Sequence, residues 1–179
     1  IDGFDVSGVS KSTSTRDINK IYSINETYRK TIDEKDLFNF FKEYVSKYKK
    51  PIDQAKESVL LKSMGFLKNK AKTLEDIWNN AQYIINDKIE VGLDDKKLID
   101  DLSKKVINDF INEFEKLSSL SKEILEPVIK SLIDKHKTNF KGVGQPLRIA
   151  LVGSRFGPGL YDVILSLDKT EVIKRLKSF

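Results

Sequence analysis

Residues 146–153, Pro-Leu-Arg-Ile-Ala-Leu-Val-Gly, decide the fold class of this chain, because they suit either a short helix or a buried strand. After three further residues comes the turn Gly157-Pro158-Gly159-Leu160. If 147–152 formed a strand, the glycine loop behind it would indicate nucleotide binding. That loop lacks the Lys-Ser or Lys-Thr of a phosphate-binding loop, and its glycines do not match the Gly-x-Gly-x-x-Gly fingerprint. One apolar hexamer also builds no sheet, so we favour a short helix over 146–152 and keep the strand as the minor alternative.

The rest of the chain has the apolar spacing of amphipathic helices, with steps of three and four residues. The stripe Leu37, Phe41, Tyr44 and Tyr48 is one example and predicts a buried helix face. A second stripe runs from Ile99 to Leu117 and predicts one long helix. We predict helices over 17–30, 31–48, 51–64, 73–87, 94–117, 121–137, 146–152, 158–167 and 169–178. The chain is therefore expected to be all-α.

Several helix ends carry local signals. Thr31-Ile32-Asp33-Glu34 resembles a capping box, in which threonine and glutamate satisfy each other's backbone amides. Gly65 is placed to end a helix as its C-terminal cap. The basic residues Lys174, Arg175 and Lys177 suit the negative end of the last helix dipole. A charged segment with Gly92, residues 87–95, separates two helical subdomains, which we place at 1–90 and 91–179.

Composition bounds the class of protein. The 179 residues carry 32 basic and 27 acidic side chains, a net charge of +5. This mild excess permits phosphate binding without requiring it. There is no cysteine, which excludes disulfides and thiolate metal sites and fits a reducing cytoplasm. No apolar run is long enough for a bilayer, so no membrane partner is expected. Because the chain begins at Ile1, we expect a piece of a longer protein.

The residues offer no catalytic centre. His136 is the single histidine, and its lysine-rich surroundings predict a solvated surface position. Without cysteine or a second histidine, we expect no metal site. The pairs Asp94-Asp95 and Asp100-Asp101 read as exposed charge rather than as an acid–base pair. These absences favour a binding module over an enzyme active site.

Several segments, in the correct order, give the chain a resemblance to the C-terminal end of bacterial glutamate–tRNA ligases. The tail matches the family's Pro-Leu-Arg-hydrophobic-Ala-Leu-x-Gly, its proline turn and its closing Arg-Leu, and the upstream matches cover nearly the whole chain. The matching segments are 4–6, 9–12, 17–25, 70–74, 146–153, 157–160 and 167–176. The family's catalytic signatures, His-x-Gly-His and Lys-x-Ser-Lys, are absent. The resemblance therefore implies an anticodon-binding region without its active site, built as two consecutive helical subdomains that form a helical bundle.

The resemblance also implies the partners. The parent enzyme would charge tRNA(Glu) with glutamate, and ATP and magnesium would act in a catalytic part that is missing here, so this chain needs no cofactor. Arg148 would face the anticodon, together with Gly157, Pro158 and Leu160, with Leu160 packing on a base. Lys70 stands where the family often has an arginine that contacts the last anticodon base. Because lysine lacks the planar fork of arginine, discrimination against tRNA(Gln) is in doubt, and tRNA(Gln) is a second candidate partner. A cytoplasmic monomer is expected.

Alternative interpretations stay open at this point. The main alternative function is a helical protein-interaction domain without RNA binding, with residues 94–117 as its docking helix. A free-standing hydrolase is a third, and the lack of a catalytic constellation counts against it. Each site residue also has a purely structural explanation. For Arg148 it is a salt bridge to the neighbouring helix, for Lys70 an exposed helix end, and for the proline–glycine turn a helix connector. Lys20 and Asn25 are expected to be structural despite matching the family.

Overall fold

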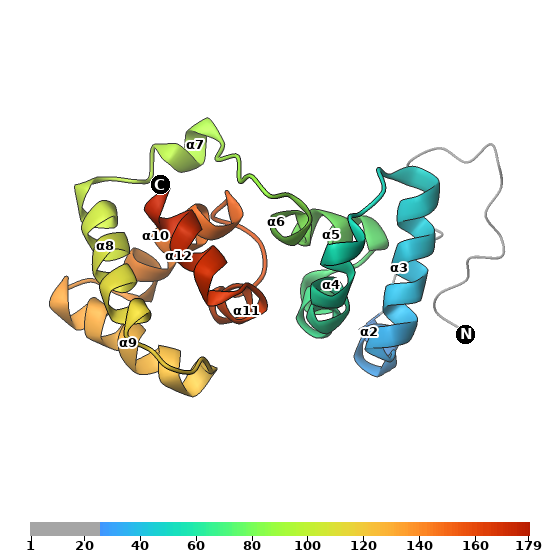
Figure 1. The fold of residues 1–179 in the computed structure, drawn as a ribbon, viewed down its shortest axis with the longest axis horizontal. Coiled ribbons are helices and arrows are strands. Elements are labelled where there is room, and N and C mark those ends of the chain that lie inside the picture. The colour runs from blue at the N-terminus through green and yellow to red at the C-terminus, as the bar shows by residue number, and fades with distance from the viewer. Residues whose placement is uncertain (1–25) are drawn as a thin grey trace. The chain divides into compact units, whose positions relative to one another are not determined.

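A computed structural model describes residues 26–179 and consists of helices and connecting loops (Figure 1). This part of the chain contains no β-strand, which confirms the all-α prediction. The strand alternative for residues 147–152 is wrong, because these residues lie in one helix. The predicted helix over 17–30 falls outside the described residues up to position 25, as do Lys20, Asn25 and the segments 4–6 and 9–12. The chain divides into two compact units between Ile85 and Asn86.

The first unit packs short helices around one apolar core. In its described part, α3 lies against α4, and α5 and α6 add further contacts. The stripe on α3 is buried at Leu37, Phe41 and Tyr44, whereas Tyr48 is half-buried, with its ring 5.5 Å from that of Tyr44. The elements are α2 (Glu26–Thr31), α3 (Glu34–Tyr48), α4 (Gln54–Leu67), the 3-10 turn η1 (Lys68–Lys70), α5 (Leu74–Asn80) and α6 (Gln82–Ile85).

Two predicted helix ends in this unit are wrong. Thr31 does not cap α3 but is the last residue of α2, and its hydroxyl donates to the Thr27 and Tyr28 carbonyls of that helix. The cap of α3 is Asp33, whose carboxylate accepts the Lys35 amide. Gly65 lies inside α4 rather than at its end. A Cβ there would come within 2.4 Å of a Glu34 carboxylate oxygen, so the exposed Glu34 side chain would have to move.

The second unit is built around α10 (Phe140–Val152), which contacts α8, α9, α11 and α12. Most of its side chains are buried because α10 is apolar on several faces: Val143, Gly144, Pro146, Leu147, Ile149, Ala150 and Leu151. The surrounding elements are α7 (Leu93–Lys96), α8 (Asp101–Glu115), α9 (Lys122–Lys135), α11 (Leu160–Ser166) and α12 (Lys169–Lys177).

The expected long helix over 94–117 is interrupted. α7 ends at Lys96, and Asp100 starts α8 anew by accepting the Ser103 amide at 2.8 Å. The backbone of Asp100 is extended, with φ −99° and ψ −174°, which stops a helix from passing through it. Leu102, counted in the apolar stripe, is exposed. The local cap therefore overrides a periodic pattern that continues across the break.

The helix expected over 146–152 is longer than predicted. α10 begins six residues before Pro146, where the Asn139 side chain accepts the Gly142 amide at 2.9 Å. Proline is favoured in a first turn, and that preference placed the predicted start too late. Here Pro146 is buried in the helix interior. The cost of the backbone hydrogen bond that proline cannot make is offset by its packing in the core.

His136 is also placed differently from the prediction. It ends α9 and its side chain is only 10% exposed. Its Nε2 lies 2.7 Å from a carboxylate oxygen of Asp109 on α8, and Lys135 contacts the same oxygen at 3.0 Å. These contacts, Lys135 first, hold the pKa of Asp109 below its usual range. The histidine therefore ties α9 to α8 instead of facing solvent.

Candidate nucleic-acid interface

Arg148 projects from the central helix of the second unit and is half-buried. One terminal nitrogen, Nη1, donates to the Arg155 carbonyl at 3.1 Å. The Nε atom is buried and has no hydrogen-bond partner among the described residues. Burial lowers the pKa of the guanidinium, which nevertheless stays protonated in proteins. A buried donor without a partner costs free energy, so part of the hydrogen-bonding capacity of Arg148 is unused in this structure.

The salt-bridge explanation of Arg148 finds no support here. Within residues 26–179, no carboxylate lies close enough to its guanidinium to form an ion pair. The neighbouring arginines do form such pairs, Arg155 with Asp95 and Arg175 with Glu171. The charge of Arg148 is therefore the one of the three that is available to a partner molecule.

The loop between α10 and α11 carries the predicted proline–glycine turn. It starts at Gly153, which ends α10 in the left-handed conformation at φ 85°. A Cβ on Gly153 would come within 2.5 Å of the Glu90 carbonyl oxygen, so only glycine fits this approach. Gly157 has φ 132°, and the position of its absent Cβ is open space. Glycine at both ends lets the loop leave one helix and enter the next in a few residues.

A second arginine fixes this loop to α7. Nε of Arg155 donates to a carboxylate oxygen of Asp95 at 2.6 Å, and the Asp95 side chain is only 15% exposed. The expectation that Asp95 is merely exposed charge is therefore wrong. The Arg155 guanidinium also lies 5.5 Å from the ring centre of Phe156, which is 73% exposed. Sequence reasoning missed these three residues; an Arg-Phe pair between two loop glycines was the available signal.

The structure brings most of the predicted site residues together in the second unit. Arg148 contacts the loop that leads to Gly157 and Pro158, and Pro158 is buried. Leu160 is the first residue of α11 and is 2% exposed. Its side chain belongs to the core and is not available to pack on a base, which corrects the role predicted for it.

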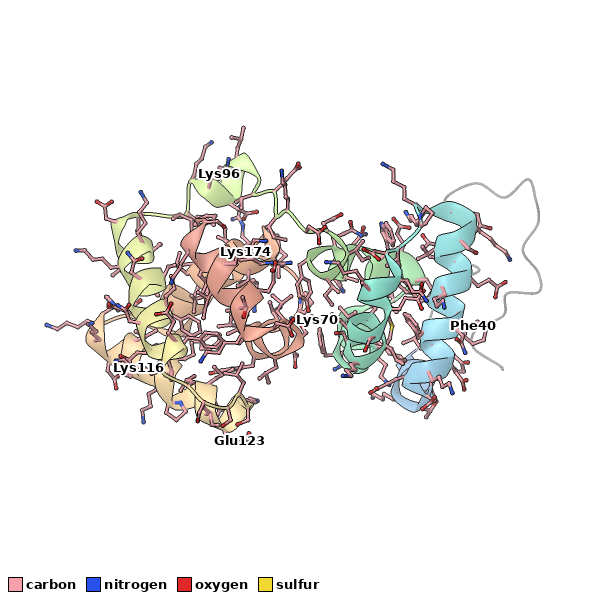
Figure 2. The ribbon with its side chains drawn as sticks, viewed as in Figure 1. Phe40, Lys70, Lys96, Lys116, Glu123 and Lys174 are labelled. Atoms are coloured by element: carbon pink, nitrogen blue, oxygen red, sulfur yellow. The ribbon has the colours of Figure 1, made fainter. Side chains whose placement is uncertain are left out.

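Lys70 lies in the other unit, exposed at the end of η1 (Figure 2). The segment around it is held from both sides. The Arg29 guanidinium donates to the Ala71 carbonyl at 2.9 Å, and a capping box between Thr73 and Asp76 starts α5. The predicted start of a helix at Thr73 is confirmed. These contacts fix the backbone on both sides of Lys70, and the residue itself is exposed.

Arg175 supports the end of α10. It was expected to serve the dipole of its own helix, but it is buried and its Nη1 donates to the Leu151 carbonyl at 2.8 Å. Leu151 lies in the last turn of α10, where carbonyls have no partner within the helix. The Nε of Arg175 donates to a carboxylate oxygen of Glu171 at 2.9 Å. Arg175 therefore joins α12 to the helix that carries Arg148.

Other kinds of site were sought in the same residues. In 26–179, no group of histidine and carboxylate side chains is arranged to hold a metal ion. Within that range, too, every helix is too short or too polar to cross a bilayer.

Comparison with known proteins gives consistent matches. A family model described as an anticodon binding domain matches residues 36–179. The glutamate–tRNA ligase of Pelagibacter ubique (strain HTCC1062) is 51% identical over 176 residues, which cover 98% of this chain and 38% of the relative. That of Nitrobacter hamburgensis is 30% identical over 184 residues, covering 98% and 39%. The chain thus spans less than two fifths of the length of these relatives.

Solved structures share the fold. A glutamate tRNA ligase from Elizabethkingia meningosepticum, crystallised with its amino acid, matches with a TM-score of 0.69 at 22% identity. The match covers 86% of this chain and 30% of that one. A glutamate–tRNA synthetase from Elizabethkingia anophelis matches with a TM-score of 0.63, also at 22% identity.

Proposed function

The chain belongs to the family of anticodon-binding domains, and we propose on that basis that it is the tRNA-anticodon-binding portion of a glutamate–tRNA ligase. The parent enzyme would join glutamate to tRNA(Glu) at the expense of ATP, with ATP and magnesium bound by a catalytic portion that this chain does not include. The setting would be the cytoplasm, where tRNA is charged. The observation that supports RNA binding most directly is the Arg148 guanidinium, which is charged, half-buried and without an ion-pair partner among residues 26–179.

Arg148 suits an unpaired base or a phosphate for a geometric reason. Its guanidinium is a planar fork of donors that can meet two acceptors at once. The bond from Nη1 to the Arg155 carbonyl limits the rotation of the side chain, so less side-chain entropy is lost on binding. Bases of a single-stranded loop present carbonyl oxygens and ring nitrogens on their exposed edges. We therefore assign Arg148 to an edge of an anticodon base, with the Gly157–Gly159 backbone beside it.

Lys70 is the proposed second contact, made by the first unit. Lys70 is an exposed residue, and the ammonium of lysine is a point charge that suits a phosphate or one acceptor on a base. One hydrogen bond from a lysine distinguishes between bases less well than two hydrogen bonds from an arginine. We therefore propose that tRNA(Gln) is a second, poorer ligand, with discrimination depending mainly on other contacts.

The test is the affinity of the 179-residue chain for tRNA(Glu), compared between wild type, Arg148→Ala and Arg148→Lys at one salt concentration. We expect Arg148→Ala to weaken binding by about 1–3 kcal/mol, the range for a good two-pronged contact with a base. Arg148→Lys should recover only part of this, because lysine keeps the charge without the fork. Lys174→Ala, an exposed cation on α12, is the control.

Two outcomes would contradict the proposal. Equal affinity of wild type and Arg148→Ala would remove Arg148 from the RNA site. Failure of the wild-type chain to bind tRNA would leave a helical protein-interaction domain as the better description. Thermal unfolding of each variant shows whether an affinity change comes from lost folding, because Arg148 also donates a hydrogen bond to the Arg155 carbonyl of the loop.

A further inference from the structure

We propose that Phe156 is a stacking platform for an unpaired base of the bound RNA, and that Asp95 holds this platform in place through Arg155. This inference rests on the proposed function and adds to it a residue whose contribution comes from ring stacking instead of hydrogen bonding. It also gives Asp95 of α7 a part in RNA binding, through its ion pair with Arg155.

The first observation is the exposure of the ring. Phe156 is 73% exposed, more than any other aromatic side chain in residues 26–179. The two other exposed aromatic residues, Phe140 and Phe179, are 46% and 41% exposed. An aromatic ring in water loses the free energy that burial would provide. Its position in the loop that also receives Arg148 points to a ligand as the group that covers it.

The second observation is that the ring sits in an ordered loop. The Phe156 amide donates to the Ser154 hydroxyl at 3.0 Å, and the preceding residue is anchored to α7 by the short ion pair between Arg155 and Asp95. The Arg155 guanidinium lies 5.5 Å from the ring centre, within reach of a cation–π contact. One side of the ring is thereby supported by a cation, and most of the ring surface remains in solvent.

The third observation is the neighbouring chemistry, which selects a nucleobase over an apolar side chain. The carbonyl of Arg155, the residue before Phe156, accepts the hydrogen bond from Arg148. The hydrogen bond from Arg148 therefore connects its guanidinium to the residue next to Phe156. A flat group with a π face and acceptors on its edge satisfies both at once, and an unpaired base has this form. An aliphatic partner would cover the ring but would offer no acceptor to the Arg148 guanidinium, which forms no ion pair within residues 26–179.

The main test pairs protein and RNA changes in the full chain. The probe is the anticodon stem-loop of tRNA(Glu), intact or with one anticodon base at a time removed to leave an abasic site. We expect Phe156→Ala to weaken binding of the intact RNA about 5- to 150-fold, the range for one base–aromatic stack. Phe156→Tyr should bind like wild type. Against the RNA that lacks the stacked base, Phe156→Ala and wild type should bind equally.

Each outcome has a distinct meaning. If wild type binds and Arg148→Ala weakens binding but Phe156→Ala does not, stacking is refuted while the proposed function stands. If Phe156→Ala weakens all the RNAs by the same factor, no single base rests on the ring, and the inference is overturned. If wild type does not bind the stem-loop, the proposed function fails and the inference fails with it. Leu93→Ala, which changes a side chain that is 77% exposed, is the matched control and should bind like wild type.

A spectroscopic readout tests the contact itself. The chain has a single tryptophan, Trp78, in the first unit. In Phe156→Trp, the fluorescence change on adding RNA, less the change seen in wild type, reports the new ring. A stacked base should quench it strongly and should shield it from a soluble quencher. Unchanged emission at saturating RNA would refute stacking even if affinity had fallen.

The role of Asp95 as a positioning residue is tested by combining Asp95→Asn with Phe156→Ala. Asp95→Asn removes the charge that holds Arg155, and we expect a loss of RNA affinity smaller than that of Phe156→Ala. In a Phe156→Ala background, Asp95→Asn should have no further effect, because the platform it positions is gone. An equal effect of Asp95→Asn in both backgrounds would show that it acts independently of the ring, and would remove Asp95 from the proposal.

Discussion

Replacing Arg175 by alanine tests whether the second unit depends on a side chain that joins α12 to α10. Arg175 is 6% exposed. Its Nη1 donates to the Leu151 carbonyl at 2.8 Å, and its Nε donates to Glu171 at 2.9 Å. In Arg175→Ala the carbonyl at the end of α10 loses its partner while it stays buried, and the helix that carries Arg148 loses its support at that end.

The expected cost follows from these two contacts. A hydrogen bond from a charged donor contributes about 1.5–3 kcal/mol. The pair with Glu171 is spaced i, i+4 and its acid is partly exposed, so it adds only about 0.3–0.5 kcal/mol. Loss of the packed aliphatic stem adds to both. We expect the free energy of unfolding to fall by about 2–4 kcal/mol.

The measurement is urea unfolding followed by far-ultraviolet circular dichroism. Fluorescence of Trp78 follows the first unit separately, so the shift can be assigned to the second. Arg175→Lys, which keeps a charge and a donor without the fork, should lose less. Lys174→Ala changes the exposed neighbour on α12 (Figure 2) and should stay within about 0.5 kcal/mol of wild type. A loss of less than about 1 kcal/mol for Arg175→Ala would refute the reasoning, because it is below the least expected for this bond.

The other predictions concern acid stability and backbone geometry. Because the pKa of Asp109 is lowered, chiefly by the hydrogen bond from Lys135, its stabilising effect is present above the ordinary aspartate pKa and is lost as the pH falls through the lowered value. Asp109→Asn should therefore reduce the acid-side fall in the urea midpoint, and an identical pH profile would contradict this. Gly153→Ala should destabilise by about 2 kcal/mol or more, because a clash with the Glu90 backbone adds to the cost of its left-handed conformation. Gly92→Ala, at an ordinary φ with nothing nearer than 4.0 Å to the added carbon, is the control in the same unfolding assay.

Local signals predicted helices well where one hydrogen-bonding arrangement was available. Thr73 starts α5 and Ser121 caps α9, because each side chain reaches an amide in the following turn. Prediction failed where two arrangements competed. Thr31 fitted the capping-box pattern, but it is the last residue of α2, and Asp33 caps α3 instead. Gly65 satisfied the rule for a helix end but lies inside α4, with the Glu34 side chain, 31 residues away in the sequence, beside it.

Candidate site residues were predicted by resemblance more than by pattern. Arg148 and the turn at Gly157 share one surface region of the second unit. Burial of Leu160 could not be read from the sequence, because an apolar residue at a helix start can face either the core or solvent. The pair Asp95 and Arg155 is 60 residues apart. No periodicity or motif links positions at that separation, so the loop anchor became visible only in the folded unit.

Apolar spacing and helix caps, which act over one or two turns, determined that this chain is helical and where most helices begin. The tertiary structure alone decided which polar groups meet: Arg175 with the end of α10, Asp95 with Arg155, and Arg148 left with an unsatisfied nitrogen. The physical reason is the distance along the chain over which each kind of interaction acts. A helical turn is set by neighbours in the chain, whereas satisfaction of a buried charge depends on groups that only packing brings within 3 Å or so of one another.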